Sequence, residues 1–233
     1  MATPRRSTRR VFLATAGTAL GLCALGGRLR SPADAATRNA QPVERNPAQL
    51  RRLLRTMETK GGQYWSVPRA DGELLHFLIK ATRTRSVLEV GTSHGYSAVW
   101  MGLALEETGG RLTTIEIDSA RHDLARRHLR EAGLSQRVTL IHGDAHAQVN
   151  ALTGPFDFVF LDADKEGQVD YFHKLYPRKL TPGGIFAVHN AIRQADAMRD
   201  YLDLVRTHPA FDTVTVSATM DDGFCLSHRR RTT

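Results

Sequence analysis

Apolar residues recur along the chain with two different spacings. From residue 48 onward, the spacing of an amphipathic helix is found in segments 48–60, 71–81, 97–105, 119–132, 171–180 and 196–207. Short apolar runs typical of buried strands lie between them, at 86–90, 112–117, 138–142, 156–162 and 185–188. Two further strand-like segments, 213–217 and 223–228, close the chain.

This alternation of strand and helix patterns predicts an α/β fold, because parallel strands need crossover helices that cover both faces of the sheet. We expect a Rossmann-like, doubly wound, mostly parallel seven-stranded sheet with helices on both faces and a C-terminal antiparallel hairpin. The pattern shows no second core, so residues 48–233 are expected to form one domain.

The first part of the chain has a different pattern. Arg9 and Arg10 stand directly before an uncharged stretch, residues 11–27, and Ala33-Asp34-Ala35 follows. A basic pair, an apolar stretch and a small-x-small site are typical of a secretory signal peptide, and the paired arginines resemble a twin-arginine export signal. We expect residues 1–35 to direct export to the periplasm or the outside, and residues 36–47 to be a flexible lead-in. The alternative is an uncleaved signal that anchors the protein in the membrane.

The composition sets limits on the partners. The 233-residue chain has a formal charge of +8, but six of its arginines lie within residues 1–35, and the remainder carries 26 basic and 23 acidic residues. This small excess does not indicate nucleic-acid binding. Only Cys23 and Cys225 are present, which excludes a cysteine-rich zinc cluster and, after signal cleavage, an internal disulfide.

A glycine-bearing loop follows the first strand of the predicted sheet. Gly91 and Gly95 are four residues apart, and Glu89 precedes them, whereas dinucleotide-binding enzymes use a G-x-G-x-x-G spacing around a pyrophosphate. A carboxylate at Glu89 would repel a pyrophosphate but suits an ammonium group. Glu116 ends the next strand, where a carboxylate can accept ribose hydroxyls. The alternative is that the two glycines only make a tight turn.

Polar side chains also follow the fourth and fifth strands. Asp162, Asp164 and Lys165 come directly after the fourth strand, and His189 and Asn190 come after the fifth. Because open α/β sheets bind ligands at the carboxyl ends of their strands, we expect these residues to share a site with the glycine loop.

These motifs together resemble the caffeoyl-CoA and catechol O-methyltransferases over about residues 46–229. The resemblance is carried by Glu89-Val90-Gly91-Thr92-Ser93-His94-Gly95-Tyr96-Ser97, Thr114-Ile115-Glu116-Ile117-Asp118, Leu161-Asp162-Ala163-Asp164-Lys165, and Pro182-Gly183-Gly184 with His189-Asn190. It implies S-adenosylmethionine (SAM) as cofactor and a small catechol-like or phenolic acceptor. The contacts that it implies are Glu89, Gly91, Thr92 and Ser97 at the methionine and sulfonium end, Glu116 at the ribose, Ala145 at the adenine, Asp164 at the cofactor amine, and Val67 from the N-terminal segment, with Asp162 also binding the cofactor.

The same resemblance implies Lys165 as general base and a divalent metal held by Asp162, His189 and Asn190. The chain departs from the family at His189, where the family has a second aspartate. Magnesium prefers oxygen ligands, whereas imidazole suits softer ions. Three interpretations follow: a softer metal, weak magnesium binding through Asp162 and Asn190, or a metal-free site with Lys165 or His189 as base.

The sequence thus predicts an O-methyltransferase, with a possible homodimer, no nucleic-acid partner and no stable membrane span after cleavage. An exported cofactor-binding protein with little turnover is the first alternative, since SAM is made in the cytoplasm. A nicotinamide dehydrogenase is the second. The aromatic residues that could wall the acceptor are Tyr64, Trp65, Tyr171 and Phe172, with packing in the core or in a lid as the equal alternative.

The export prediction is tested by replacing Arg9 and Arg10 with lysine. The charge stays the same, so loss of export in a fractionation assay would identify the twin-arginine route. The matched control replaces Arg5 and Arg6 with lysine and is expected to leave export intact. Unchanged export of the Arg9/Arg10 variant would rule this route out.

Overall fold

The computed structural model describes residues 45–218 and 221–231, and the expected signal segment lies outside them. The helices are α2 (Pro47–Thr59), η1 (Gly61–Tyr64), α3 (Arg69–Ala81), α4 (Tyr96–Thr108), α5 (Ser119–Glu131), α6 (Ala145–Ala151), α7 (Gln168–Leu175) and α8 (Arg199–Thr207). The strands are β1 (Ser86–Val90), β2 (Arg111–Glu116), β3 (Val138–His142), β4 (Phe156–Leu161), β5 (Leu180–His189), β6 (Phe211–Val216) and β7 (Phe224–Arg229).

The strands form one seven-stranded sheet in the order β3-β2-β1-β4-β5-β7-β6. The first five strands are parallel, and β7 pairs antiparallel with both β5 and β6. This confirms the predicted fold class. The order reverses at β1, which lies between β2 and β4, and open sheets bind ligands at such a reversal.

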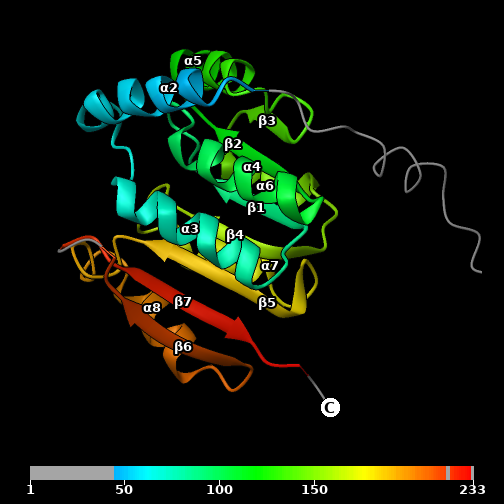
Figure 1. Cartoon of the computed structure of the whole chain (residues 1–233). Helices are drawn as coiled ribbons and strands as arrows, with labels where there is room; N and C mark the ends of the chain where they lie inside the picture. Colours follow the sequence, from blue (N-terminus) through cyan, green and yellow to red (C-terminus); the bar gives the residue numbers. More distant parts are fainter. Residues whose placement is uncertain (1–44, 219–220, 232–233) are drawn as a thin grey trace, which may run out of the picture.

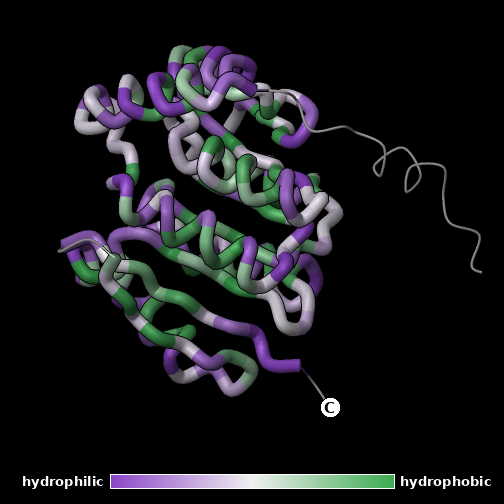
Figure 2. The backbone as a smooth tube through the Cα atoms, in the orientation of Figure 1, coloured by the Kyte–Doolittle hydropathy of each residue, from purple (hydrophilic) through white to green (hydrophobic). Residues whose placement is uncertain are grey.

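Two apolar layers cover the sheet because alternate strand residues point to opposite faces. In β4, Phe158 packs with α2, α3, α4 and α5, whereas Val159 packs with α6, α7 and α8. Figure 1 shows α3 and α4 in front of the sheet, and Figure 2 shows apolar residues concentrated along its central strands. Both faces are therefore buried, as a parallel sheet requires.

Helix boundaries follow from local capping. The side chains of Asn46, Asp118 and Asp144 accept backbone N–H bonds at the first turns of α2, α5 and α6. Two of these caps follow strands directly, so they start their helices close to the carboxyl edge of the sheet. These N-caps fix where the loops that leave the strands end and where the helices begin.

The structure corrects the prediction around Pro182. The helix expected over 171–180 ends at Leu175, because Tyr176 is extended before Pro177. Pro182 and the two glycines after it lie inside β5, beside a register irregularity opposite Phe156 and Phe158. Helix α6 was not predicted, since it has only seven residues.

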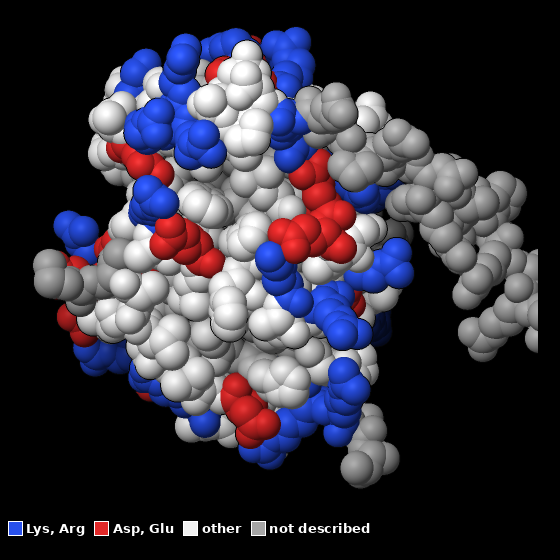
Figure 3. Space-filling model, in the orientation of Figure 1, with Lys and Arg blue, Asp and Glu red and all other residues white. Residues whose placement is uncertain are grey.

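Part of the expected lead-in packs against the domain. Arg45 forms an ion pair with Glu106 of α4 and donates to the carbonyl oxygen of Gly133. Contacts with the domain therefore begin at Arg45, inside the segment expected to be a lead-in, and not at residue 48. Among the described residues, no helix is long and apolar enough to span a membrane. Figure 3 shows basic and acidic side chains mixed on the visible face, without a continuous basic surface.

Candidate active site

The carboxyl ends of the three central strands converge on one cavity. The register pairs Val90 of β1 with Leu161 of β4, and Leu161 with Val188 of β5. The residues that follow these positions are therefore neighbours, as the sequence predicted. A cavity of about 1140 Å³ opens above them. It is lined by the predicted residues Val67, Gly91, Thr92, Ser97, Glu116, Ala145, Asp162, Asp164, Lys165, His189 and Asn190.

The glycine loop lies directly against the end of β4. Gly91 has a φ of 96°, and a Cβ on it would lie 2.5 Å from the carbonyl oxygen of Asp162. Only glycine combines this backbone conformation with so close an approach. The loop then enters α4 through Gly95, which also has a positive φ, 89°. The backbone of the loop is thus exposed to the cavity without intervening side chains at Gly91.

Glu89 differs from its predicted role. It is completely buried beneath the loop and does not line the cavity, and its carboxylate accepts hydrogen bonds from Ser97 and Thr114. Burial raises the pKa of Glu89 to about 7, although the bonds from Ser97 and Thr114 act in the opposite direction. Strand β1 is buried on both faces, which directs this side chain under the loop. Glu89 therefore affects the cavity indirectly, by accepting a hydrogen bond from Ser97, which lines it.

Glu116 has the position that was expected of a ribose ligand. Its two carboxylate oxygens accept the backbone N–H groups of Ser93, at 2.6 Å, and Asp118, at 2.9 Å. These bonds fix the carboxylate between the glycine loop and the start of α5. It lies at the end of β2, on the cavity wall.

Asp164 also lines the cavity, but at the Ala145 end. It accepts a hydrogen bond from the hydroxyl of Tyr171 at 2.9 Å and contacts His146 Nε2 at 3.2 Å. The His146 ring stacks on Tyr171, with ring centroids 4.2 Å apart. Asp164 thus lies on the side expected for adenine, whereas the backbone of Asp162 lies against Gly91.

Asp162 is the centre of a charged network. It accepts from Lys165 Nζ at 2.9 Å, and His189 Nδ1 lies 3.3 Å from the same carboxylate oxygen. Burial acts to raise the pKa of Asp162, but the charges of Lys165 and His189 outweigh it and lower that pKa below its usual value. The carboxylate is therefore ionised and paired with two cationic groups.

His189 faces a second carboxylate that was not predicted. Its Nε2 lies 2.8 Å from Asp71 Oδ2, and Asp71 is completely buried in α3. Burial disfavours a charge on the ring, but the Asp162 and Asp71 carboxylates outweigh it and raise the pKa of His189 to about 9. These contacts favour a protonated ring, which has no lone pair with which to take a proton from an acceptor.

The aromatic residues divide between the cavity and the core. Tyr64, Trp65 and Tyr171 line the cavity, whereas Phe172 is buried among core rings such as Phe186. Trp65 is 78% exposed, with the Arg121 guanidinium 4.6 Å from its ring centre. An exposed aromatic ring at the rim of a cavity is available to contact a bound molecule.

Comparison with known proteins agrees with this geometry. The model of a family described as O-methyltransferase matches residues 40–217. The chain belongs to the O-methyltransferase family. A catechol O-methyltransferase of Mycobacterium tuberculosis is 34% identical over 177 residues, 70% of this chain and 80% of that protein.

Solved O-methyltransferases share the fold. The SAM complex of TomG from Streptomyces achromogenes, involved in tomaymycin synthesis, has 25% identity and a TM-score of 0.69, covering 85% of this chain and 96% of that one. The SAH complex of a Bacillus cereus O-methyltransferase has 24% identity and a TM-score of 0.71, covering 84% and 96%. Both structures share the fold of this chain, and the SAM and SAH that they hold are ligands of those two proteins.

The residues do not fit the magnesium site that the family implies. Asp162 is paired with Lys165, and both ring nitrogens of His189 face carboxylates. Asn190 turns its amide toward Asp222, with Nδ2 donating to Oδ1 at 3.2 Å. His189, with a carboxylate at each ring nitrogen, therefore presents no free lone pair to a cation, whereas the contacts of Asp162 and Asn190 engage Oδ1 and Nδ2 and leave their other oxygens facing the site.

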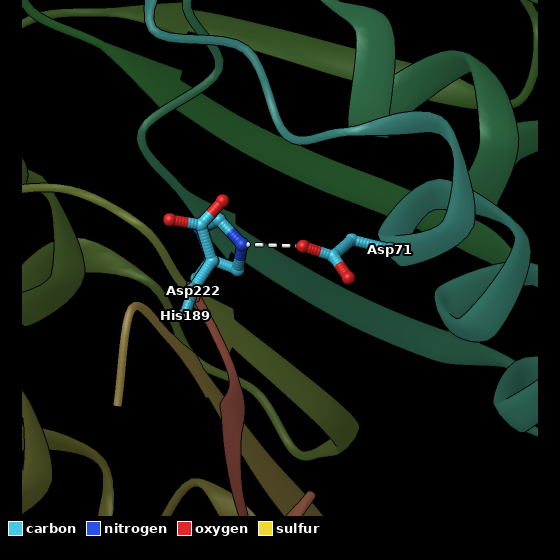
Figure 4. A group of neighbouring side chains, drawn as sticks. All are labelled: Asp71, His189 and Asp222. Atoms are coloured by element: carbon cyan, nitrogen blue, oxygen red, sulfur yellow. Dashed lines mark hydrogen bonds and ion pairs between the residues drawn. The ribbon is translucent and has the colours of Figure 1, made fainter. Parts of the chain in front are cut away.

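Asp71, His189 and Asp222 form a group of described residues that could hold a metal ion, because one ligand atom of each lies within 4.8 Å of the others. Figure 4 shows the three side chains converging, with the hydrogen bond between His189 and Asp71 drawn as a dashed line. A ring nitrogen that donates to a carboxylate has no lone pair for a metal. In this geometry His189 is engaged as an ion-pair partner of Asp71 and does not present a lone pair to a metal.

No motif in the sequence points directly to Asp71 or Asp222. Asp71 lies in the first turn of α3, where an acid is common for reasons of the helix dipole, and Asp222 precedes β7 in a segment that carries no motif. An indirect signal was His189, because an imidazole in place of the family's aspartate needs a hydrogen-bond partner that no motif identifies.

The close contact at Gly91 predicts a specific defect in Gly91→Ala. We expect the free energy of unfolding to fall by roughly 2–4 kcal/mol, because the methyl group meets the Asp162 backbone at a positive φ. SAM affinity by calorimetry should fall at least about tenfold, since 1.4 kcal/mol corresponds to tenfold. The control is Gly109→Ala, which has φ +76° but no atom nearer than 3.9 Å and should cost only about 1 kcal/mol. Equal effects of the two substitutions would contradict the contact.

The raised pKa of Glu89 predicts a pH-dependent stability. The folded protein holds a proton on Glu89 up to about pH 7, whereas its ordinary pKa is 4.5, so stability is lost as the pH rises between these values. Glu89→Gln removes this dependence. In denaturant unfolding, the free energy of unfolding of the variant relative to that of the wild type should increase from pH 5 to pH 8, by roughly 3 kcal/mol at most. The exposed substitution Glu107→Gln should show no such gain. A difference that is constant with pH for Glu89→Gln would refute this environment.

Proposed function

We propose that this protein transfers the methyl group of SAM to a hydroxyl group of a small catechol-like or phenolic acceptor. The observation that carries the proposal is the placement of Lys165 beside Asp162 in the same cavity as the Gly91 loop and Glu116. The catechol O-methyltransferase name of the mycobacterial relative supports this class of acceptor.

The cavity residues have distinct parts in SAM binding. The Gly91 backbone and Ser97 contact the methionine end, Glu116 accepts the ribose hydroxyls, and Ala145 borders the adenine. SAM supplies a methyl group on a positively charged sulfur, which becomes a neutral thioether when the group leaves. Asp162, ionised and at the Gly91 end, offers a carboxylate to the cationic methionine portion.

Lys165 acts on the acceptor. The side chain is 10% exposed, and its amine lies at the cavity wall, held in direction by Asp162. In its neutral form the amine takes the proton of the acceptor hydroxyl while the oxygen forms its bond to the methyl carbon. The oxygen, methyl carbon and sulfur must be in line, so the walls that orient the acceptor contribute to the rate. Tyr64 and Trp65 are placed to do so from the rim.

Two measurements separate this proposal from its alternatives. Calorimetry should show binding of SAM and none of NAD, and binding of NAD alone would remove the methyltransferase assignment. A panel of catechols and simple phenols, analysed for methylated product, then distinguishes an enzyme from a cofactor-binding protein with little turnover.

The export of the protein through residues 1–35 remains part of the proposal.

Lys165→Ala tests the proton acceptor. We expect kcat to fall by about 10²–10⁴, the usual contribution of a general base. The affinity for SAM should change less than about threefold, a difference of under 1 kcal/mol. The matched control is Lys80→Ala, which removes an exposed lysine paired with Glu107 and should leave kcat unchanged. Activity of the Lys165 variant equal to the wild type would refute the assignment.

A further inference from the structure

Both nitrogens of the His189 ring are engaged by carboxylates. Nε2 lies 2.8 Å from Asp71 Oδ2, Nδ1 lies 3.3 Å from Asp162 Oδ1, and the side chain is 4% exposed. A neutral imidazole has one N–H group and one lone pair, and an ionised carboxylate can only accept. Only a ring that carries both protons satisfies the two contacts at once.

The surroundings hold this ring in place. The rings of Phe160 and Phe224 pack against it, with centroids 6.3 and 5.1 Å away. Asp71 comes from α3, Asp162 from the end of β4, and Asp222 from the segment before β7. The cationic neighbours are Lys165, which binds Asp162, and Arg193, whose guanidinium lies 3.5 Å from Asp222. A buried charge is tolerated in such a position only when it is paired.

This arrangement has the electrostatic effect that a divalent cation would have at the same strand ends. Where the resembled family has an aspartate, a protonated histidine replaces one negative charge by one positive charge. The local charge therefore rises by two units, as much as a bound divalent ion brings. With the Asp162 carboxylate neutralised in this way, negative charge that develops on an acceptor oxygen near Lys165 does not face an uncompensated anion.

We propose that His189, clasped by Asp71 and Asp162, takes the place of the divalent cation, so that this O-methyltransferase works without a metal. The inference rests on the proposed methyl transfer for its catalytic meaning, whereas the exclusion of the metal is a property of the site itself. Asp71 is the positioning residue, since it fixes the ring through Nε2 from the opposite side to the cavity.

Metal binding by the purified full chain tests the exclusion directly. We expect calorimetric titrations with Mg²⁺, Mn²⁺ and Zn²⁺ to show no stoichiometric binding below about 1 mM, and product formation to change less than twofold after chelation. Stoichiometric binding that is lost in His189→Gln would show that the ring is a ligand, and would overturn the proposal.

The state of the ring is observable without activity. In ¹⁵N-histidine-labelled protein at neutral pH, both His189 nitrogens should have the shifts of protonated nitrogens, assigned by comparison with His189→Gln. Asp71→Asn should move the Nε2 signal and lower kcat more than it changes the SAM affinity. A single protonated nitrogen in the wild type would contradict the proposal.

His189→Asp supplies the reciprocal test, because it adds a carboxylate beside Asp71, Asp162 and Asp222. We expect this variant to be destabilised alone and to regain stability with Mg²⁺ or Mn²⁺, seen as a rise in Tm of several degrees. His173→Asp, the same change at an exposed position on α7, is the control and should show no such response. If neither ion raised the Tm of His189→Asp, the assignment of metal exclusion to His189 would be contradicted.

These measurements also keep the two proposals apart. A protein that binds SAM but methylates no acceptor would refute the proposed function, while the calorimetry and the ring signals would still decide the role of His189. A metal-dependent methyltransferase would refute the inference and leave the proposed function intact.

Discussion

The close approach of the Gly91 backbone to the Asp162 backbone is the constraint on which the site depends. The hydrogen bond from Asp162 N to the Val90 carbonyl, at 2.9 Å, continues the pairing of β1 and β4 to the last residue of each strand. The loop that receives the cofactor and the acid that pairs with Lys165 are therefore fixed by one ladder of backbone bonds. Displacing either backbone would move the methyl donor relative to the proton acceptor.

The sequence predicted most of the fold and most of the cavity because both follow from periodic signals. Strand patterns and their turn residues place polar side chains at one edge of the sheet, so Glu116, Lys165 and Asn190 could be assigned to one site from order alone. The sequence does not show on which face of the sheet the Glu89 side chain lies. In the structure it is buried beneath the loop and does not line the cavity. Asp71 could not be predicted, since it lies 118 residues before His189 in the sequence and meets it only through the tertiary structure.

Two buried carboxylates at this edge show how environment assigns different behaviour to one chemical group. Glu89 has only hydroxyl partners, and burial raises its pKa to about 7. Asp162 is largely but not completely enclosed, with its side chain 13% exposed, and Lys165 and His189 keep its pKa below the usual value. The first acid is therefore a structural hydrogen-bond partner for Ser97, whereas the second is a permanent negative charge within the cavity. Environments that separate two titratable groups in this way are typical of functional sites.

The balance of charge around Asp162 argues that His189 is an integrated part of the site. Asp71 and Asp162 contribute two negative charges, and Lys165 and His189 contribute two positive ones, within a continuous chain of contacts. Removing one member would leave a buried charge unpaired, which typically costs about 3–5 kcal/mol. A histidine introduced without Asp71 would leave one ring nitrogen without an acceptor. The substitution at the strand end and the acid on α3 are therefore interpretable only together, as one electrostatic unit that spans β4, β5 and α3.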